Sequence, residues 1–191
     1  SNVVDFKALW AKSAPRHNLW KHLLDVSAVS LELPTSAVSP GWEAQHIAFL
    51  VGLHDIGKAD SGFQHQKWRD SEGRECSFSE ELNAAGYHDC RDAPCRHERI
   101  SKQFIIDMLT KQQMDAYFAD AIARAVVAHH GYWNESARSV APEYAEAQNQ
   151  LCDMLRQVLN VDSLPTKPPP DLSAFGMRLA GHVVLCDWIA S

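Results

Sequence analysis

The sequence predicts an all-α protein that folds as one helical domain. Apolar residues recur with the 3.6-residue period of an amphipathic helix over most of the chain, and no segment shows the sustained two-residue alternation of a half-buried strand. Glycine and proline residues follow several of these periodic segments, as they do at helix ends. With 191 residues the chain has the size of one domain and can bury a sizeable core. We therefore expect a single helical bundle over residues 1–191.

Six segments carry the helical pattern. The first stops at Pro34, and the second has a nearly all-apolar centre, which is typical of a buried helix with Gly57 as its C-terminal cap. The fifth begins with a proline in the first turn. Two stretches lack the pattern: residues 70–96 resemble a long ordered loop or insertion, and residues 164–173 are a stiff proline-rich connector. The expected helices cover residues 18–33, 42–57, 97–112, 114–131, 142–159 and 173–191.

Composition excludes several classes of protein. The chain is 46% hydrophobic and 22% charged, and it has no apolar run near the ~20 residues that a membrane-spanning helix needs. The N-terminal residues lack the pattern of a signal peptide, so we expect a cytoplasmic protein without a membrane partner. The net charge of -6 argues against tight electrostatic binding of nucleic acid over a broad surface. A phosphate must therefore be held locally.

The five cysteines are odd in number and scattered, which favours a reducing compartment over a disulfide framework. Cys76, Cys90 and Cys95 fall in or beside the irregular region. A small structural zinc site there is conceivable, although the spacing is not that of a standard zinc finger.

The stretch GLHDIGKA at residues 52–59 has two interpretations. By spacing, Gly52, Gly57 and Lys58 match most of a phosphate-binding P-loop. That motif needs a preceding strand and a Ser or Thr after the lysine, whereas here a helical pattern precedes it and Ala59 follows. The neighbouring His54 and Asp55 favour the second interpretation, a metal site.

A second pair of neighbouring ligands supports the metal interpretation. His129 and His130 stand just before Gly131, as His54 and Asp55 stand just before Gly57. We expect both pairs in the last turns of helices, where the unpaired carbonyls favour a bound cation. Neighbours on a helix point about 100° apart, so such a pair suits two ions better than one. A carboxylate such as Asp55 can bridge two cations about 3.5–4 Å apart, as in enzymes that hydrolyse phosphate esters.

Structural roles remain open for these residues. His54 and Asp55 can form a buried ion pair, and His129 and His130 can cap a helix end. His17 competes with His22, and His88 competes with His97, as further ligands. Asp187 is a carboxylate in an otherwise apolar helix, where such a group normally has a partner. His46, His65 and His182 receive no role, and Trp188 is assigned to core packing.

Five short motifs resemble those of the HD nuclease domain of the CRISPR-associated type I helicase-nuclease, a branch of the HD phosphohydrolase superfamily. The motif HDIGK alone identifies only the HD phosphohydrolase superfamily. The adjacent histidines before a glycine and the terminal D-W-[IL]-x-S pattern narrow the resemblance to the CRISPR-associated nuclease domain. The resemblance covers about residues 17–191 in the family's order. The motifs are WKHLLDV (20–26), HDIGK (54–58), RHE (96–98), HHG (129–131) and CDWIAS (186–191).

The resemblance implies an HD-domain helical bundle with a dinuclear metal site. One metal would be held by His22, His54, Asp55 and Asp187, and the second by Asp55, His97, His129 and His130. Lys58 would lie beside the scissile phosphate, and a water made acidic by the two cations would attack phosphorus. The nitrogen-rich ligand set suits iron, manganese, cobalt, nickel or zinc better than calcium.

The resemblance also implies a substrate and partners. The expected activity is metal-dependent cleavage of single-stranded DNA, which a helicase module of the same polypeptide or complex supplies after a guide-RNA surveillance complex has opened the target. The chain would then be one domain of a longer helicase-nuclease. Two alternatives stay open: an HD phosphohydrolase of small nucleotides, and a catalytically silent docking domain.

Overall fold

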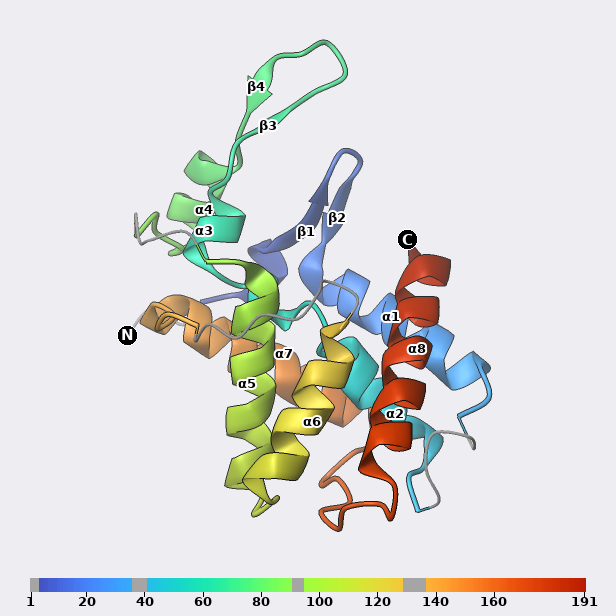
Figure 1. Ribbon diagram of the computed structural model, residues 1–191. Helices are drawn as coiled ribbons and strands as arrows, with labels where there is room; N and C mark the ends of the chain where they lie inside the picture. Colours follow the sequence, from blue (N-terminus) through green and yellow to red (C-terminus); the bar gives the residue numbers. More distant parts are fainter. Residues whose placement is uncertain (1–3, 36–40, 91–94, 129–136) are drawn as a thin grey trace.

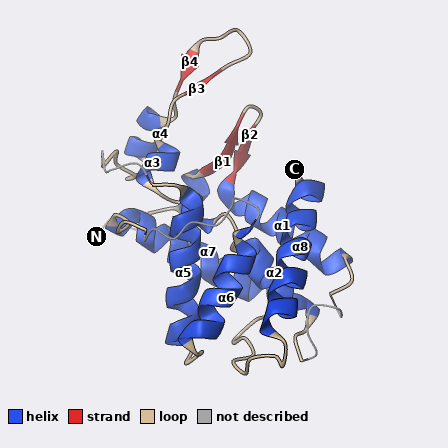
Figure 2. Ribbon diagram, in the orientation of Figure 1, coloured by secondary structure: helices blue, strands red, loops and turns tan. Residues whose placement is uncertain are grey.

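The computed structural model describes residues 4–35, 41–90, 95–128 and 137–191, and it confirms a mainly helical domain. Two single-turn 3-10 helices, η1 (Phe6–Ala8) and η2 (Ile56–Lys58), and two small hairpins accompany the α-helices (Figures 1 and 2). In this part of the chain the helices are α1 (Leu19–Glu32), α2 (Ala44–Gly52), α3 (Ser61–Gln64), α4 (Ser79–Ala84), α5 (His97–Lys111), α6 (Ala116–Val126), α7 (Pro142–Leu159) and α8 (Leu172–Ala190).

Helix α2 is the centre of the core. Its residues from Ile47 to Gly52 are all buried, as its apolar sequence predicts. Helices α1, α7 and α8 pack against α2, and α6 packs against both α5 and α8. Helix α8 therefore contacts α1, α2 and α6, although it lies at the opposite end of the sequence from α1. None of the helices in the described ranges is long and apolar enough to cross a membrane.

The chain leaves the α-helical path before His54 and Asp55, contrary to the expectation of a helix up to Gly57. Helix α2 ends at Gly52, and the chain continues through a turn into η2. The carbonyl of Val51 accepts from the backbone N–H of His54 at 3.1 Å and from Nδ1 of the same histidine at 2.8 Å. This i→i+3 pairing tightens the backbone, and similar bonds continue through the amides of Ile56 and Lys58.

Gly57 has a packing role instead of the expected capping role. It lies inside η2, where its amide donates to Oγ of Ser101 on α5 at 2.7 Å. A β-carbon on Gly57 would overlap the carbonyl oxygen of His97 and would lie 2.6 Å from the Ser101 amide nitrogen. The absence of a side chain therefore lets η2 touch the first turn of α5, which begins at His97.

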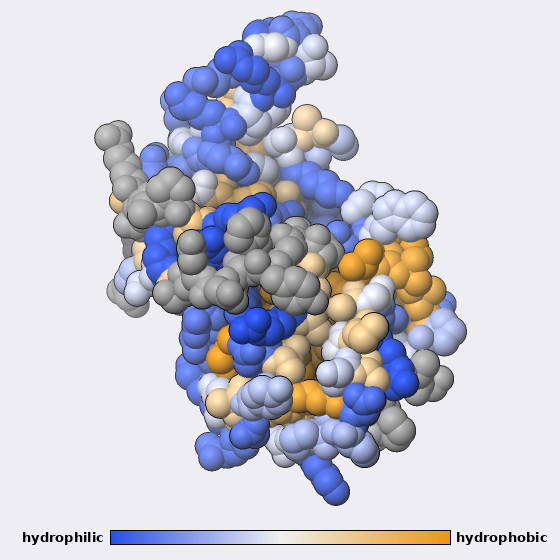
Figure 3. Space-filling model, viewed as in Figure 1, coloured by the Kyte–Doolittle hydropathy of each residue, from blue (hydrophilic) through white to orange (hydrophobic). Residues whose placement is uncertain are grey.

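Two short antiparallel hairpins occur where the sequence pattern indicated no strands. Strands β1 (Trp10–Ser13) and β2 (Arg16–Asn18) form the first, and β3 (Trp68–Arg69) and β4 (Glu75–Cys76) form the second. These strands are too short for an alternating pattern to develop. The second hairpin begins just before the predicted insertion of residues 70–96 and continues into it, and it projects from the helical body with a hydrophilic surface (Figures 2 and 3).

Two expectations about the later helices are also wrong. Helix α6 ends at Val126 and does not run on to Gly131. Trp188 is 77% exposed, so it does not pack in the core. Helix α8 buries a stripe of side chains spaced three and four residues apart, and Trp188 falls outside it. That stripe consists of Phe175, Leu179, His182, Val183 and Cys186.

We predict that Gly57→Ala lowers the free energy of unfolding by about 1–3 kcal/mol, because the added methyl group overpacks the contact between η2 and α5. Urea unfolding followed by circular dichroism measures the effect. Gly176→Ala is the control, since nothing lies within 4 Å of a β-carbon at this helical position. Alanine there is expected to stabilise by about 0.5–1 kcal/mol. Equal stability of Gly57→Ala and the wild type would contradict the packing argument.

Candidate metal centre

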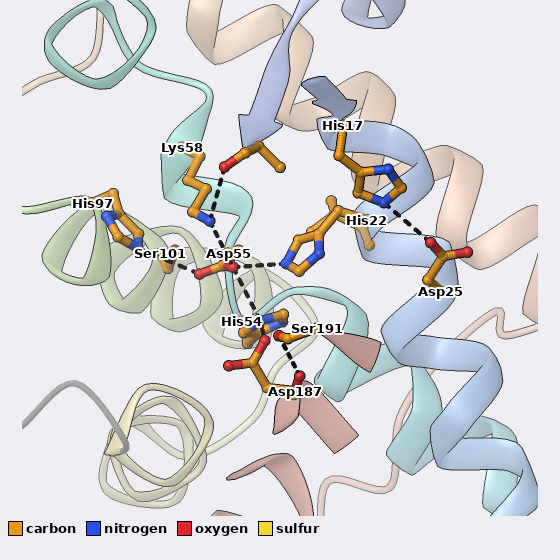
Figure 4. A network of polar contacts seen from close by, with 12 residues as sticks. His17, His22, Asp25, His54, Asp55, Lys58, His97, Ser101, Asp187 and Ser191 are labelled. Carbon is orange, nitrogen blue, oxygen red and sulfur yellow. Dashed lines mark hydrogen bonds and ion pairs between the residues drawn. The ribbon is translucent and has the colours of Figure 1, made fainter. Parts of the chain in front are cut away.

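A buried carboxylate, that of Asp55, lies where several elements of the fold meet (Figure 4). Asp55 comes from the turn between α2 and η2, and it is only 4% exposed. His22 on α1 and Asp187 on α8 reach it from helices at opposite ends of the chain. Four side chains each offer one ligand atom, and all of these atoms lie within 4.8 Å of one another: His22, His54, Asp55 and Asp187.

His22 is held by the amphipathic pattern of α1. It lies on the buried face of that helix with Leu19, Leu23 and Val26. Its Nε2 lies 2.8 Å from Oδ2 of Asp55. Burial lowers the pKa of His22, and the contact with Asp55 opposes this shift without reversing it. At neutral pH this imidazole is therefore uncharged, as a metal ligand must be.

The orientation of His54 is set by the turn that follows α2. Because the Val51 carbonyl can only accept, the Nδ1 of His54 must carry the proton in their 2.8 Å bond. This leaves Nε2 facing two carboxylates, at 3.1 Å from Oδ2 of Asp55 and 3.2 Å from Oδ1 of Asp187. A backbone carbonyl bonded to the far nitrogen commonly orients a metal-binding histidine.

The charge of His54 depends on these two carboxylates. Burial lowers the pKa of His54, but the charges and hydrogen bonds of Asp55 and Asp187 outweigh burial and raise it to about 10. In the metal-free protein a proton on Nε2 thus stands between the two carboxylates. A divalent cation would replace this proton with a stronger positive charge.

Two further predicted residues touch Asp55. The Nζ atom of Lys58 lies 3.1 Å from Oδ2 of Asp55 and 3.4 Å from the carbonyl oxygen of Ala11 in β1. The Nε2 atom of His97 lies 3.4 Å from Oδ1 of Asp55, on the side opposite to His22 (Figure 4). The two carboxylate oxygens of Asp55 therefore face different histidines.

The donor set fits a divalent transition metal. It combines two imidazole nitrogens with two carboxylate oxygens, a mixture that suits iron, manganese, cobalt, nickel or zinc. Two ligands on opposite sides of an ion bonded at about 2.1 Å are about 4.2 Å apart, close to the 4.8 Å within which the four atoms lie. Small side-chain movements would close the cluster around one ion.

The structure separates the competing histidines. His17 pairs with Asp25 at 3.1 Å at the edge of the cluster, whereas His22 contacts Asp55 directly. The backbone carbonyl of His88 accepts from the Tyr144 hydroxyl, and the contact with Asp55 comes from His97. His129 and His130, the remaining predicted ligands, lie outside the described residues.

The cysteines contribute no metal cluster within the described residues. All five fall in this part of the chain and form no disulfide. The metal-type grouping found there contains the four histidine and aspartate side chains alone. The conceivable zinc site of Cys76, Cys90 and Cys95 is therefore not formed.

Sequence reasoning missed several neighbours of the site. Phe63, on α3, places its ring 5.4 Å from that of His97 and 5.3 Å from Nζ of Lys58. Ser101 binds the Gly57 amide, and the Ala11 carbonyl contacts Lys58. Phe63 could have been found from the sequence, because it is an aromatic residue that closely follows the HDIGK motif. The Ala11 carbonyl could not, because no local sequence pattern shows that a backbone group of a distant hairpin reaches Lys58.

A helical fold that brings histidines and an adjacent His-Asp pair around one buried carboxylate defines the class of HD-type metal-binding domains. The comparison with family models narrows this class. The chain belongs to the family described as the HD domain of Cas3, whose model matches residues 10–191. This result confirms the family resemblance read from the motifs.

Individual relatives agree with this assignment. The chain is 29% identical over 212 residues to the CRISPR-associated endonuclease/helicase Cas3 of Thermus thermophilus, with 96% of this chain and 22% of the relative covered. A crystal structure of a CRISPR-associated protein matches with a TM-score of 0.73 and 30% identity, over 98% of this chain and 23% of that one. The Thermus thermophilus Cas3 HD domain solved in the presence of Ni²⁺ matches with a TM-score of 0.62 and 25% identity, over 96% of this chain and 75% of that one. The chain thus spans about a fifth of the length of the curated relative.

We predict that binding of one divalent ion at pH 7 releases about one proton. Below its pKa of about 10, His54 carries a proton that the ion must displace, whereas the lowered pKa of His22 leaves that ring neutral. Affinity should therefore rise as the pH increases toward 10. Calorimetric titrations with Co²⁺ at one pH, in buffers of different ionisation enthalpy, measure the number of protons released.

The observed heat should vary linearly with the ionisation enthalpy of the buffer. Asp187→Asn is the matched variant, because loss of that charge lowers the pKa of His54 and should reduce the proton release. A heat that is the same in every buffer would contradict the protonated state assigned to His54.

Proposed function

We propose that this domain is a metal-dependent nuclease that hydrolyses phosphodiester bonds of single-stranded DNA in type I CRISPR interference. The observation that carries the proposal is the buried cluster of His22, His54, Asp55 and Asp187, with Lys58 beside it. Membership of the Cas3 HD family supports a CRISPR-associated nuclease. The choice of single-stranded DNA rests on the family resemblance.

The cluster supplies the ligands that phosphodiester hydrolysis requires. A divalent cation bound by these four side chains would polarise the phosphate and lower the pKa of the attacking water. His22, His54 and Asp55 are almost fully buried, which keeps their geometry rigid and limits competition from solvent. The Asp187 side chain is 27% exposed, so the cluster is open toward solvent on the α8 side, where substrate can approach.

Lys58 would stabilise the negative charge that develops on the phosphate. Its side chain is 12% exposed, and its ammonium group is held between the Asp55 carboxylate and the Ala11 carbonyl. The ring of Phe63 beside Nζ further restricts its position. A positive charge that is already in place needs no rearrangement during the reaction, which makes its stabilisation more effective.

A second ion is part of the proposal. The two oxygens of Asp55 face His22 and His97 respectively, as expected for a carboxylate that bridges two ions. We propose His97, His129 and His130 as the other ligands of this second ion. The partly exposed ring of His97 lies at the start of α5, where Gly57 allows close approach to η2.

The proposed partners follow from the family. The chain, taken as a single domain over residues 1–191, would act as one part of a longer helicase-nuclease. The curated relative, of which it matches 22%, is named as both an endonuclease and a helicase. A helicase module would deliver the single strand after a guide-RNA surveillance complex has exposed it. Such delivery would also remove the need for a broad basic surface on a domain of net charge -6.

We predict that Asp55→Asn lowers metal affinity and nicking of circular single-stranded DNA by more than about 100-fold. The substitution keeps the shape of the side chain but removes the charge shared by His22, His54 and Lys58. Metal content by mass spectrometry and nicking on gels, with and without a chelator, measure both effects. Asp107→Asn, at an exposed position of α5, is the control and should match the wild type.

Full cleavage by Asp55→Asn, or by the wild type after chelation, would refute the metal mechanism. Hydrolysis of nucleotides without cleavage of DNA would instead favour a small-nucleotide phosphohydrolase. A wild type that shows neither activity even when divalent metal is supplied would favour a docking domain.

We predict that Lys58→Met lowers kcat by about 100- to 1,000-fold without weakening metal binding. The lysine touches Asp55 but offers no lone pair in its charged form, so its loss removes a competing cation and leaves the ligands intact. Single-turnover cleavage and Co²⁺ titration separate the two effects. Lys67→Met, on a side chain 67% exposed, serves as the control for loss of a positive charge. A parallel loss of Co²⁺ affinity and rate in Lys58→Met would show that the lysine acts through the metal site instead.

A further inference from the structure

A buried polar pair joins the two helices that carry ligands from opposite ends of the chain. The Oγ atom of Ser30 on α1 lies 2.8 Å from Nε2 of His182 on α8. Ser30 is fully buried and His182 is 9% exposed. The Sγ atom of Cys186, one turn further along α8, lies 3.5 Å from the same nitrogen. Helix α1 also carries His22, and helix α8 carries Asp187.

The pair is buried between α1 and α8, which gives the hydrogen bond its importance. Burial lowers the pKa of His182, so the ring is neutral and adds no charge to the interface. Apolar contacts are not directional, and they tolerate small sliding and rotation of one helix on another. A hydrogen bond between two buried side chains has a narrow range of good distances and angles, and an unpaired partner is costly. One such bond therefore specifies how α8 is placed on α1.

Both helices lead from this pair to the metal centre. Traced backward from Ser30, α1 reaches His22 after about 12 Å, at 1.5 Å per residue. Traced forward from His182, α8 reaches Asp187 after about 7.5 Å. The pair and the cluster are thus two connections between the same two helices, one buried in the core and one at the edge of solvent.

The position of the Asp187 carboxylate depends on the placement of α8 more than the positions of the other ligands depend on the placement of their own elements. Its side chain is 27% exposed, whereas His22 and His54 are enclosed on all sides by the core. The Asp187 oxygen lies 3.2 Å from Nε2 of His54, which is near the long end of a hydrogen bond. A shift of α8 by about 1 Å would take this carboxylate out of ligand distance.

We propose that Ser30 and His182 are positioning residues for the metal site. Their hydrogen bond holds α8 on α1 in the one placement that brings Asp187 against His54 and Asp55. This inference rests on the proposed function, because it assumes that these side chains bind a metal. It assigns a role to His182, which the motif pattern left without one.

The test uses the whole 191-residue chain and the variants Ser30→Ala and His182→Leu, singly and combined, in the wild-type and Asp187→Asn backgrounds. Each variant with an intact Asp187 should bind Co²⁺ about tenfold more weakly. The visible spectrum of bound Co²⁺ should shift toward that of Asp187→Asn. In the Asp187→Asn background the same substitutions should have no further effect, because no carboxylate remains to be positioned.

The combined Ser30→Ala/His182→Leu variant separates positioning from folding. It removes both partners of the Ser30–His182 hydrogen bond together, so it should fold as the wild type does, as judged by circular dichroism, and still bind Co²⁺ weakly. Leu151→Ala, a buried change in α7, is the control for general destabilisation and should keep wild-type affinity.

Three results would overturn the positioning role: unchanged Co²⁺ affinity in the combined variant, an equal loss in the Asp187→Asn background, or an equal loss in Leu151→Ala. A wild-type chain that binds no Co²⁺ would instead overturn the proposed function, and the positioning role with it.

Discussion

The carboxylate of Asp55 is buried where α1, η2, α5 and α8 meet, and its need for partners organises the fold. A buried charge is tolerated only when other charges and hydrogen-bond donors surround it. Here His22 from α1, Lys58 from η2 and His97 from α5 all converge on its two oxygens. The His54 ring joins it to Asp187 on α8. The fold can be understood as the arrangement of helices that brings these partners to one point.

The local backbone geometry around Asp55 also brings a partner to this carboxylate. A continuous helix through residues 53–57 would separate His54 and Asp55 by about 100° around its axis. The turn after α2 instead brings the Nε2 of His54 to 3.1 Å from its neighbour's carboxylate, with the Val51 carbonyl holding the other ring nitrogen. Gly57 then admits the first turn of α5. Backbone and side chain therefore act together to place the ligands in the described part of the chain.

The sequence predicted the fold class and most helices because amphipathic periodicity reports burial directly. The ends of the helices were predicted less accurately. Helix α2 stops at Gly52 because the contact of the His54 ring with the Val51 carbonyl tightens the turn, and hydrophobic periodicity carries no information about such a contact. Trp188 appeared apolar enough for the core, but it lies outside the buried stripe of α8. Distant contacts such as that of Lys58 with Ala11 have no local signal. The motifs nominated His22, His54, Asp55 and Asp187, which the fold brings together, whereas the roles of His129 and His130 remain predictions.

We propose that a divalent ion occupies the space between these four side chains. Anomalous diffraction from crystals of the chain grown with Mn²⁺ tests it most directly, because the signal locates the ion independently of any assay. We expect a peak about 2.0–2.3 Å from Nε2 of His22, Nε2 of His54 and one oxygen each of Asp55 and Asp187. A saturated crystal with no peak there, or with its strong peak elsewhere, would contradict it.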